Sequence, residues 1–294
     1  MKYAWIKQQR DTFPISIMCS TLKVSRSGYY KWLHTKPSAR AQRTSRIRQA
    51  VEQVHHESNQ IYGSYKIAER LRQDESLEYA CRNTVAKAMK EIGLKSKVSK
   101  KFKPITTVTD PKKQAAPNHL SQVFAASKPN EKWVTDITYL ATASGWVYLA
   151  VVLDLFSRKV VGWSMSESLA TPLVTDALRH AIQERRPETK GLLHHSDRCC
   201  QYTSDEYQRT LRTLGITCSM SRTGCCYDNA VMERFFWSLK HEWTKHEEFQ
   251  HLAEARSSVF RYIEPFYNAQ RIHQTLGYQT PNQFEETFEN QLAT

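Results

Sequence analysis

The sequence predicts an α/β domain with a mixed sheet, preceded by an all-α region. Two observations carry this prediction. Residues 1–119 contain 24 Lys and Arg against 9 Asp and Glu, a net charge of +15, whereas residues 120–294 have a net charge of −2. After residue 120 the apolar residues also change from helical spacing to short strand-like runs. The two halves therefore differ in fold, and the basic half is expected to meet a polyanion.

The composition argues against a membrane or secreted protein. No stretch approaches the roughly 18 consecutive apolar residues that a membrane span needs, and the N-terminus lacks the apolar core of a signal peptide. We therefore expect a cytoplasmic chain without a membrane partner, in which the seven cysteines are free thiols. A zinc site built from the pairs Cys199–Cys200 and Cys225–Cys226 stays open, although neither pair has the spacer of a zinc knuckle.

The basic half has the pattern of a set of helices. Residues 15–33 predict two short helices with a turn between them, and Ser25 is the expected N-cap of the second. This is a helix-turn-helix pattern. Further helices are predicted over residues 43–58, 63–74 and 81–97, each with one apolar stripe. The charge favours DNA binding over the alternative, a helical bundle whose basic surface only faces solvent.

Residues 95–117 separate the two halves. They contain seven lysines, one acidic residue and three prolines, a composition that fits no packed element. We therefore predict a linker here. Its lysines, among them Lys100, Lys101 and Lys103, are suited to lie along DNA phosphates.

The second half begins with three strand-like runs and then alternates helices with strands. The order β-β-β-α-β-α-β-α predicts a meander followed by crossovers that create parallel neighbours in a five-stranded sheet. The expected strands cover residues 131–140, 145–156, 158–167, 190–197 and 216–220, and the expected helices cover residues 171–186, 203–215 and 228–243.

Three acidic residues lie at informative places in this order. Asp136 falls inside the first predicted strand, where Asp is disfavoured. Asp197 follows the fourth strand, at the end where α/β sheets place their chemistry. Glu233 lies on the last predicted helix. Taken singly, they are explained as a bulge residue, a turn former and a surface charge, but together they favour one shared site.

The phase of that last helix supports the shared site. At about 100° per residue, Glu233, Asn229 and Lys240 form one polar stripe at the edge of the apolar face. Three converging carboxylates repel one another unless cations neutralise them, and such hard oxygen ligands suit Mg²⁺ or Mn²⁺. Two ions about 4 Å apart support an in-line phosphoryl displacement, and Lys240 is placed to hold a substrate phosphate.

The acids are separated by sixty and then thirty-five residues, within "WVTDITYL", "HHSDRCCQYTS" and "YDNAVMERFFWSLK". This pattern closely resembles the DDE transposases of bacterial insertion sequences, specifically the OrfB product of the insertion-sequence-three family; retroviral integrases have a similar core. The strings "VSRSGYYKW" and "IYGSYKIAERL" resemble that family's helix-turn-helix segments, and "YNAQRIHQTLGYQTP" resembles its C-terminal signature. The resemblance covers nearly the whole chain.

The resemblance implies an RNase H-like catalytic core behind a DNA-binding region. The implied limits are a helix-turn-helix region at 1–94, a basic linker at 95–122, an integrase core at 123–285 and a C-terminal tail at 286–294.

The resemblance also implies that Asp136, Asp197 and Glu233 are the catalytic triad and bind two Mg²⁺ ions, with Mn²⁺ as a substitute. The implied chemistry is nicking at the terminal inverted repeats to free a 3′-hydroxyl, followed by strand transfer by that hydroxyl, first between the element's own ends. The implied partners are double-stranded terminal repeats and target DNA, further copies of the chain on DNA, and an upstream-frame, OrfA-like chain or fusion. The implied location is the nucleoid of a bacterium.

Other residues are assigned to DNA by position in the family's motifs or in the basic region. His194 and His195 are open to two interpretations, contact with DNA or packing at the end of a strand. The expected DNA contacts, besides the three linker lysines, are Lys240, Asn229, Arg198, Tyr202, Arg222, Arg271, Arg26, Tyr29 and Lys66.

The chain departs from the family at its cysteines. A Gly-Ser pair is usual where Cys199 and Cys200 stand, and Asn is usual in place of Cys225, whereas Cys226 matches the family. A Cβ at position 199 is expected to strain a turn that Gly would relax, and soft thiols are poor Mg²⁺ ligands. A catalytically silent DNA-binding regulator of transposition is therefore an alternative function. A nuclease that hydrolyses without joining is another, against which the helix-turn-helix segments argue.

Overall fold

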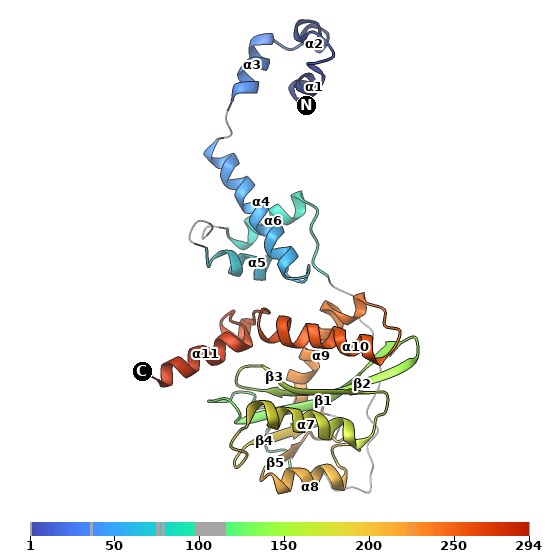
Figure 1. Ribbon diagram of the computed structural model, residues 1–294. Helices are drawn as coiled ribbons and strands as arrows, with labels where there is room; N and C mark the ends of the chain where they lie inside the picture. The colour runs from blue at the N-terminus through green and yellow to red at the C-terminus, as the bar shows by residue number, and fades with distance from the viewer. Residues whose placement is uncertain are drawn as a thin grey trace.

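The computed structural model describes residues 2–35, 38–74, 77, 80–97, 116–223 and 225–293, with the backbone alone at Cys226. Figure 1 shows three parts along the chain: helices α1 to α3, then helices α4 to α6, then a sheet with helices on both faces. Lys100, Lys101 and Lys103, which were expected to contact DNA, lie outside the described residues.

The basic half is helical, as predicted. Ser25 caps its helix by accepting a hydrogen bond from the backbone N–H of Gly28, as the sequence predicts. Helix α1 has no counterpart among the predicted elements, and it packs Ile6 against the buried ring of Tyr29 and its neighbours. The helices are α1 (Lys2–Gln9), α2 (Ile15–Thr21), α3 (Arg26–His34), α4 (Ala39–Glu57), α5 (Ser64–Leu71) and α6 (Arg82–Glu91).

The sheet has the predicted order of elements and contains parallel and antiparallel pairs. Its five strands lie in the order β3-β2-β1-β4-β5 within the described chain; β1 is antiparallel to β2 and parallel to β4. The mixed five-stranded sheet and the helical region before it confirm the predicted fold class. The strands are β1 (Lys132–Thr142), β2 (Gly145–Asp154), β3 (Val160–Ser166), β4 (Leu193–Ser196) and β5 (Thr217–Met220).

Alternate residues of β2 face opposite layers of helices. Val151 packs into the cluster that contains the helices after β5, whereas Ala150 and Val152 pack into the cluster of the crossover helices. The helices between strands are α7 (Thr171–Arg185) and α8 (Asp205–Thr213). The elements after β5 are η1 (Cys226–Asn229), α9 (Ala230–Glu242), η2 (Thr244–His246), α10 (Leu252–Arg261), η3 (Tyr262–Asn268), η4 (Gln274–Leu276) and α11 (Pro281–Leu292).

Helix α7 approaches β3 closely at one glycine. A Cβ on Gly162 would lie 2.4 Å from the carbonyl oxygen of Ala177 and 2.7 Å from the Cβ of Ala181. Any larger residue would therefore push α7 away from the sheet.

Two boundaries differ from the predicted ones. The predicted C-terminal tail begins inside α11, whose Phe288 packs against Phe156 with ring centroids 4.8 Å apart. The last residues of the predicted linker belong to the sheet domain, because Leu120 is buried in its core. Sequence composition marks where a segment becomes polar, but it does not reveal which polar segments pack.

The α4 to α6 region contacts the sheet domain through a buried tyrosine. Tyr62 donates a hydrogen bond from its hydroxyl to the carbonyl of Gln270 and accepts one from the backbone N–H of Ile272, both at 3.0 Å. Apolar side chains of both regions belong to one buried cluster. The α4 to α6 region therefore packs against the C-terminal segment that follows η3.

Candidate active site

The sheet brings Asp136 and Asp197 to the same level on neighbouring strands. Val134 in β1 pairs with His195 in β4 in parallel register, and each acid follows its strand's paired residue by two positions. Asp136 and Asp197 are both half-buried. Burial raises the pKa of Asp136 well above its usual range, and the carboxylates of Asp197 and Glu233 raise it further. The two strands therefore create a carboxylate pair with an unfavourable concentration of negative charge.

Helix α9 supplies the third acid and a cation beside this pair. The side chain of Glu233 is largely exposed, and the partial loss of solvent around it raises its pKa. Lys240 is half-buried above the ring of Tyr139, with its Nζ 4.6 Å from the ring centroid. Burial and the charge of Lys245 lower the pKa of Lys240 to about 8, while Asp136 acts in the opposite direction. Glu233 and Lys240 thus both act electrostatically on the same strand carboxylate, as the predicted polar stripe requires.

Asn229 connects this helix to β1. Its side-chain amide donates to the carbonyl of Thr135 at 3.2 Å, next to Asp136. Its Oδ1 is buried without a hydrogen-bond partner among the described residues. The helix predicted over residues 228–243 is broken here, because Asn229 ends η1 and α9 begins at Ala230. Asn229 therefore presents an unused acceptor beside the carboxylate pair.

The donor set fits a hard divalent cation only in part. Within the described ranges, no three His, Cys, Asp or Glu side chains lie close enough together to hold a metal ion. Neighbouring carboxylates nevertheless destabilise the charged form of Asp136 and so raise its pKa. A bound cation would remove this repulsion. Asp136, Asp197 and Glu233 would supply an all-oxygen donor set from β1, the end of β4 and α9.

Cys199 contacts the second acid directly. Its backbone N–H donates to Oδ1 of Asp197 at 3.0 Å, and its thiol donates to Oδ2 at 2.9 Å. Burial and Asp197 raise the pKa of this thiol far above its usual value, so it stays protonated. The expected backbone strain is wrong, because position 199 is not among the described residues with positive φ. Among the side chains that the structure describes, Cys199, Cys200 and Cys225 belong to no group that could hold a metal ion, and the side chain of Cys226 lies outside them.

The two histidines before Asp197 are packed. The His194 Nε2 contacts the hydroxyl of Tyr207 at 2.7 Å, and burial lowers the pKa of His194 to about 3. His195 lies between the hydroxyls of Ser219 and Ser221, and burial lowers its pKa to about 4. Both are neutral strand residues, which resolves the open choice in favour of packing.

Four of the expected DNA contacts are buried: Asn229, described above, and three that cannot reach DNA in this structure. Tyr29 lies in the core of α1 to α3, and Tyr202 is fully buried with its hydroxyl 3.0 Å from Oγ1 of Thr135. Arg271 is buried in an ion pair with Glu242. These expectations were wrong because residue type alone does not distinguish a tyrosine or arginine that faces solvent from one that packs.

The remaining expected contacts have different surroundings. Arg26 is exposed. Lys66 is half-buried with its Nζ 5.1 Å from the ring centre of Tyr62, and burial lowers its pKa to about 7. Arg198 donates to the carbonyl of Ser221, and Arg222 is exposed but paired with the buried Asp228. Asp228 was missed in the sequence, because its partners are identified only by the fold.

Comparisons with known proteins match both halves. Residues 42–102 match a family described as an HTH-like domain, and residues 126–226 and 214–281 match two families described as integrase core domains. Transposase InsF for insertion sequence IS3A of Escherichia coli (strain K12) is 42% identical over 287 residues, 97% of this chain and 98% of that protein. An uncharacterized 31 kDa protein of insertion element IS600 from Shigella sonnei is 39% identical over 94% of this chain and 100% of its own length.

A solved structure also aligns with the chain. One chain of the cryoEM structure of the simian T-cell lymphotropic virus intasome in complex with PP2A regulatory subunit B56 gamma has a TM-score of 0.46 and 17% identity. The alignment covers 80% of this chain and 74% of that one. Separately, none of the helices in the described residues is long and apolar enough to cross a membrane.

Proposed function

The chain belongs to the IS3 family of transposases, and from this premise we propose that it cuts the 3′ ends of its insertion sequence and transfers them to new DNA with Asp136, Asp197 and Glu233 as catalytic residues. One observation carries the proposal. Asp136 and Asp197 stand level on adjacent strands, and the charge of Asp136 is destabilised by both other acids. A repelled carboxylate cluster in an integrase core is suited to divalent cations and not to structural support.

In this proposal the three carboxylates hold two Mg²⁺ ions, for which Mn²⁺ can substitute. Ions held there would supply activation of the attacking oxygen and stabilisation of the leaving oxygen of the phosphodiester. Lys240, whose pKa of about 8 leaves it mostly protonated at neutral pH, binds a phosphate oxygen of the substrate strand. Asn229 donates its side-chain amide to β1 and has an Oδ1 without a partner among the described residues. It orients the DNA strand beside Asp136. The same groups serve hydrolysis by water and transfer by the freed 3′-hydroxyl.

The helical region supplies the DNA contacts outside the reacting phosphate. The basic charge of residues 1–119 and the HTH-like match support binding to double-stranded DNA. We expect Arg26, Lys66 and the linker lysines to contribute at the terminal repeats. Joining two ends calls for more than one protomer on DNA, and an upstream-frame partner chain stays a prediction.

The thiol of Cys199 favours a second candidate, a catalytically silent DNA-binding regulator. It donates to Oδ2 of Asp197, an oxygen that a metal ion would need. If this bond persists on DNA, the chain binds ends without cutting them.

The test uses the purified chain and a labelled duplex that carries its element's end, with Mg²⁺, Mn²⁺ or EDTA. The proposal predicts end-specific nicking and joining that require the metal. Hydrolysis without joining would instead identify a nuclease. End binding without nicking, even in Mn²⁺, would support the regulator, and restoration of nicking by Cys199→Gly would assign the silence to the thiol.

A further inference from the structure

The most heavily hydrogen-bonded carboxylate near the site is Asp228, which has no role in the chemistry proposed above. It is fully buried in η1, five positions before Glu233. Its Oδ2 accepts from the side-chain amide of Asn118 and from the backbone N–H and Nε of Arg222, at 2.9, 2.9 and 3.2 Å. Its Oδ1 accepts from Gln122 at 2.8 Å and from the Arg222 guanidinium at 3.1 Å. The thiol of Cys225 adds a contact at 3.3 Å.

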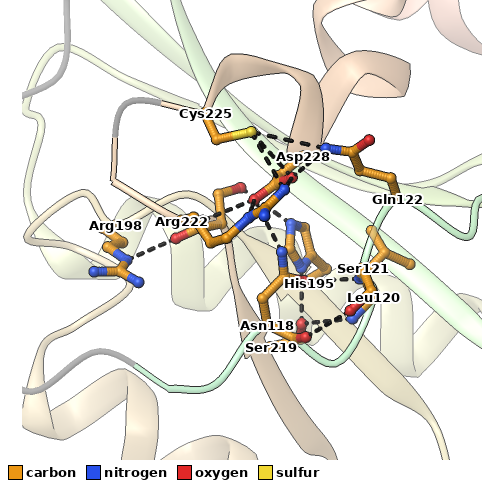
Figure 2. A network of polar contacts seen from close by, with 11 residues as sticks. Asn118, Leu120, Ser121, Gln122, His195, Arg198, Ser219, Arg222, Cys225 and Asp228 are labelled. Carbon is orange, nitrogen blue, oxygen red and sulfur yellow. Dashed lines mark hydrogen bonds and ion pairs between the residues drawn. The ribbon is translucent and has the colours of Figure 1, made fainter.

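These donors come from separate segments of the chain that meet at one carboxylate, as Figure 2 shows. Asn118 and Gln122 lie where the chain arrives from the helical region, about a hundred positions earlier in sequence. Arg222 follows β5. Asp228 itself leads directly into Asn229 and α9. The carboxylate therefore ties the incoming chain and the loop after β5 to the start of the helix that carries Glu233.

A second group of hydrogen bonds continues this connection to β4. Ser219 Oγ accepts from the backbone N–H groups of His119 and Leu120, at 2.9 and 3.1 Å. Its own proton is therefore left for Nδ1 of His195, 2.8 Å away. The His195 Nε2 then carries a proton that it can donate to Ser221, at 3.1 Å. His195 thus lies in the same framework (Figure 2).

Arg198, the residue after Asp197, also holds the loop that follows β5. Arg198 donates from Nε to the carbonyl of Ser221 at 2.6 Å and from its guanidinium to Thr223 at 2.9 Å. The segment that follows β4 and contains Asp197 and the helix that carries Glu233 are consequently connected through polar contacts to residues 221–223.

We propose that Asp228 is a positioning residue of the transposase: it fixes the start of α9 so that Asn229 and Glu233 stand beside β1 and β4, and it couples that position to the chain arriving from the DNA-binding region. The expected effect of Asp228 on strand transfer rests on the proposed function. Its structural part, the ordering of the start of α9 by Asp228, is independent of what the site catalyses.

The carboxylate is suited to this role by its chemistry. All of its identified partners are donors, so only an acceptor with two oxygens satisfies them. In Asp228→Asn one carboxylate oxygen becomes an amide whose N–H groups face donors, so the hydrogen bonds to that oxygen are lost inside the buried site of the side chain. The variant keeps the shape of the side chain, so its effect reports the lost hydrogen bonds and charge.

The test compares Asp228→Asn with Asp205→Asn, an exposed acid at the start of α8. Hydrogen exchange of the full chain is expected to rise in residues 222–233 of Asp228→Asn alone, while the β1 and β2 amides keep their protection. On end DNA we expect unchanged affinity and a loss of roughly a hundredfold in the strand-transfer rate, the effect of a small displacement at a reacting centre. The Mg²⁺ concentration for half-maximal rate should rise, which a reduced folded fraction would not cause.

Gln122→Ala and Asn118→Ala provide milder variants if Asp228→Asn does not fold. Each removes one donor without stranding a buried charge, and each is expected to reduce the rate by roughly tenfold, the equivalent of one hydrogen bond. The proposal would be overturned if hydrogen exchange in residues 222–233 equals that of the wild type in a folded Asp228→Asn. Wild-type exchange in both Gln122→Ala and Asn118→Ala would overturn it as well. If exchange rises but the wild type never cuts DNA, the proposed chemistry fails while the ordering role of Asp228 stands.

Discussion

Two carboxylate sites in this chain, Glu242 and the half-buried Asp136, have opposite electrostatics. Glu242 accepts from Nε of Arg271 at 2.7 Å and from the end of the same guanidinium at 2.5 Å, and Arg271 also donates to Ser238. Although burial opposes it, this pairing lowers the pKa of Glu242. Among the described residues Asp136 has no ion-pair partner and accepts only from the backbone N–H of Ile137 at 2.8 Å, and burial together with Asp197 and Glu233 raises its pKa.

The difference separates a structural site from a site for chemistry. A buried ion pair with matched hydrogen bonds holds its elements in place, and losing one partner leaves an uncompensated charge. A partly buried carboxylate near other carboxylates destabilises the fold unless a cation neutralises it. Removing a carboxylate should therefore have opposite consequences at the two sites.

The largest expected effect is on activity at the unpaired site. Asp136→Asn should reduce strand transfer by a factor of roughly a thousand or more, since it removes a carboxylate that the proposed chemistry requires. Its thermal midpoint in EDTA should equal or exceed that of the wild type, because a repelled charge is lost. Calorimetry and a strand-transfer assay measure the two effects. An active Asp136→Asn would contradict the assignment.

The converse change at the paired site should affect stability. Glu242→Gln leaves Arg271 buried without its counter-charge, and we expect a loss of about 3–5 kcal/mol in the free energy of unfolding. Denaturant unfolding checks this, with the exposed Glu206→Gln as the control. Strand transfer per folded molecule should stay near the wild-type rate, and a loss without destabilisation would remove the distinction between the two sites.

Asp154 offers an intermediate case. It accepts from the backbone N–H groups of Asn130 and Phe156 and lies 3.8 Å from Arg185, yet burial raises its pKa to about 6. As pH rises from about 4 to 6, the unfolded chain loses this proton first, so Asp154 lowers stability by up to about 3 kcal/mol over that window. Asp154→Asn should therefore make the free energy of unfolding rise more steeply with pH than in the wild type. An unchanged slope between pH 4 and 6 would show that Arg185 already compensates the charge.

The smallest expected effect concerns the contact between the two halves. Tyr62→Phe removes both hydrogen bonds of the hydroxyl, to Gln270 and Ile272. We expect the free energy of unfolding to fall by about 1 kcal/mol. Hydrogen exchange should increase at Ile272 and in α5 before the sheet amides change. Equal protection of Ile272 in both proteins would indicate that apolar packing alone seats the helical region.

The fold and the acids were predictable because their signals are local. Asp136 is conspicuous as an acid in a strand, and Asp197 as an acid at the end of one, so their juxtaposition follows from the order of strands. Strand and helix periodicity likewise predicted the sheet and the helical half, and the charge predicted which half meets DNA. Alternation and charge need no knowledge of distant residues.

The misassigned residues depend on distant contacts. Arg271 and Tyr202 are of types that often bind DNA, but the first meets Glu242 and the second meets Thr135 in the core. Asp228 had no visible signal because two of its donors, Asn118 and Gln122, belong to the predicted linker. The contact of Cys199 with Asp197 is local, yet only the turn geometry aims the thiol at the carboxylate.

The central claim is that Asp136, Asp197 and Glu233 form a cation site, and thermal unfolding with and without Mg²⁺ tests it most directly. A ligand that binds only the folded state at ten times its Kd stabilises it by about 1.4 kcal/mol. We predict that Mg²⁺ raises the midpoint of the wild type and of Glu242→Gln, and that the rise is lost in Asp136→Asn and Asp197→Asn and reduced in Glu233→Gln. An equal rise in every variant, or none in the wild type, would contradict the account.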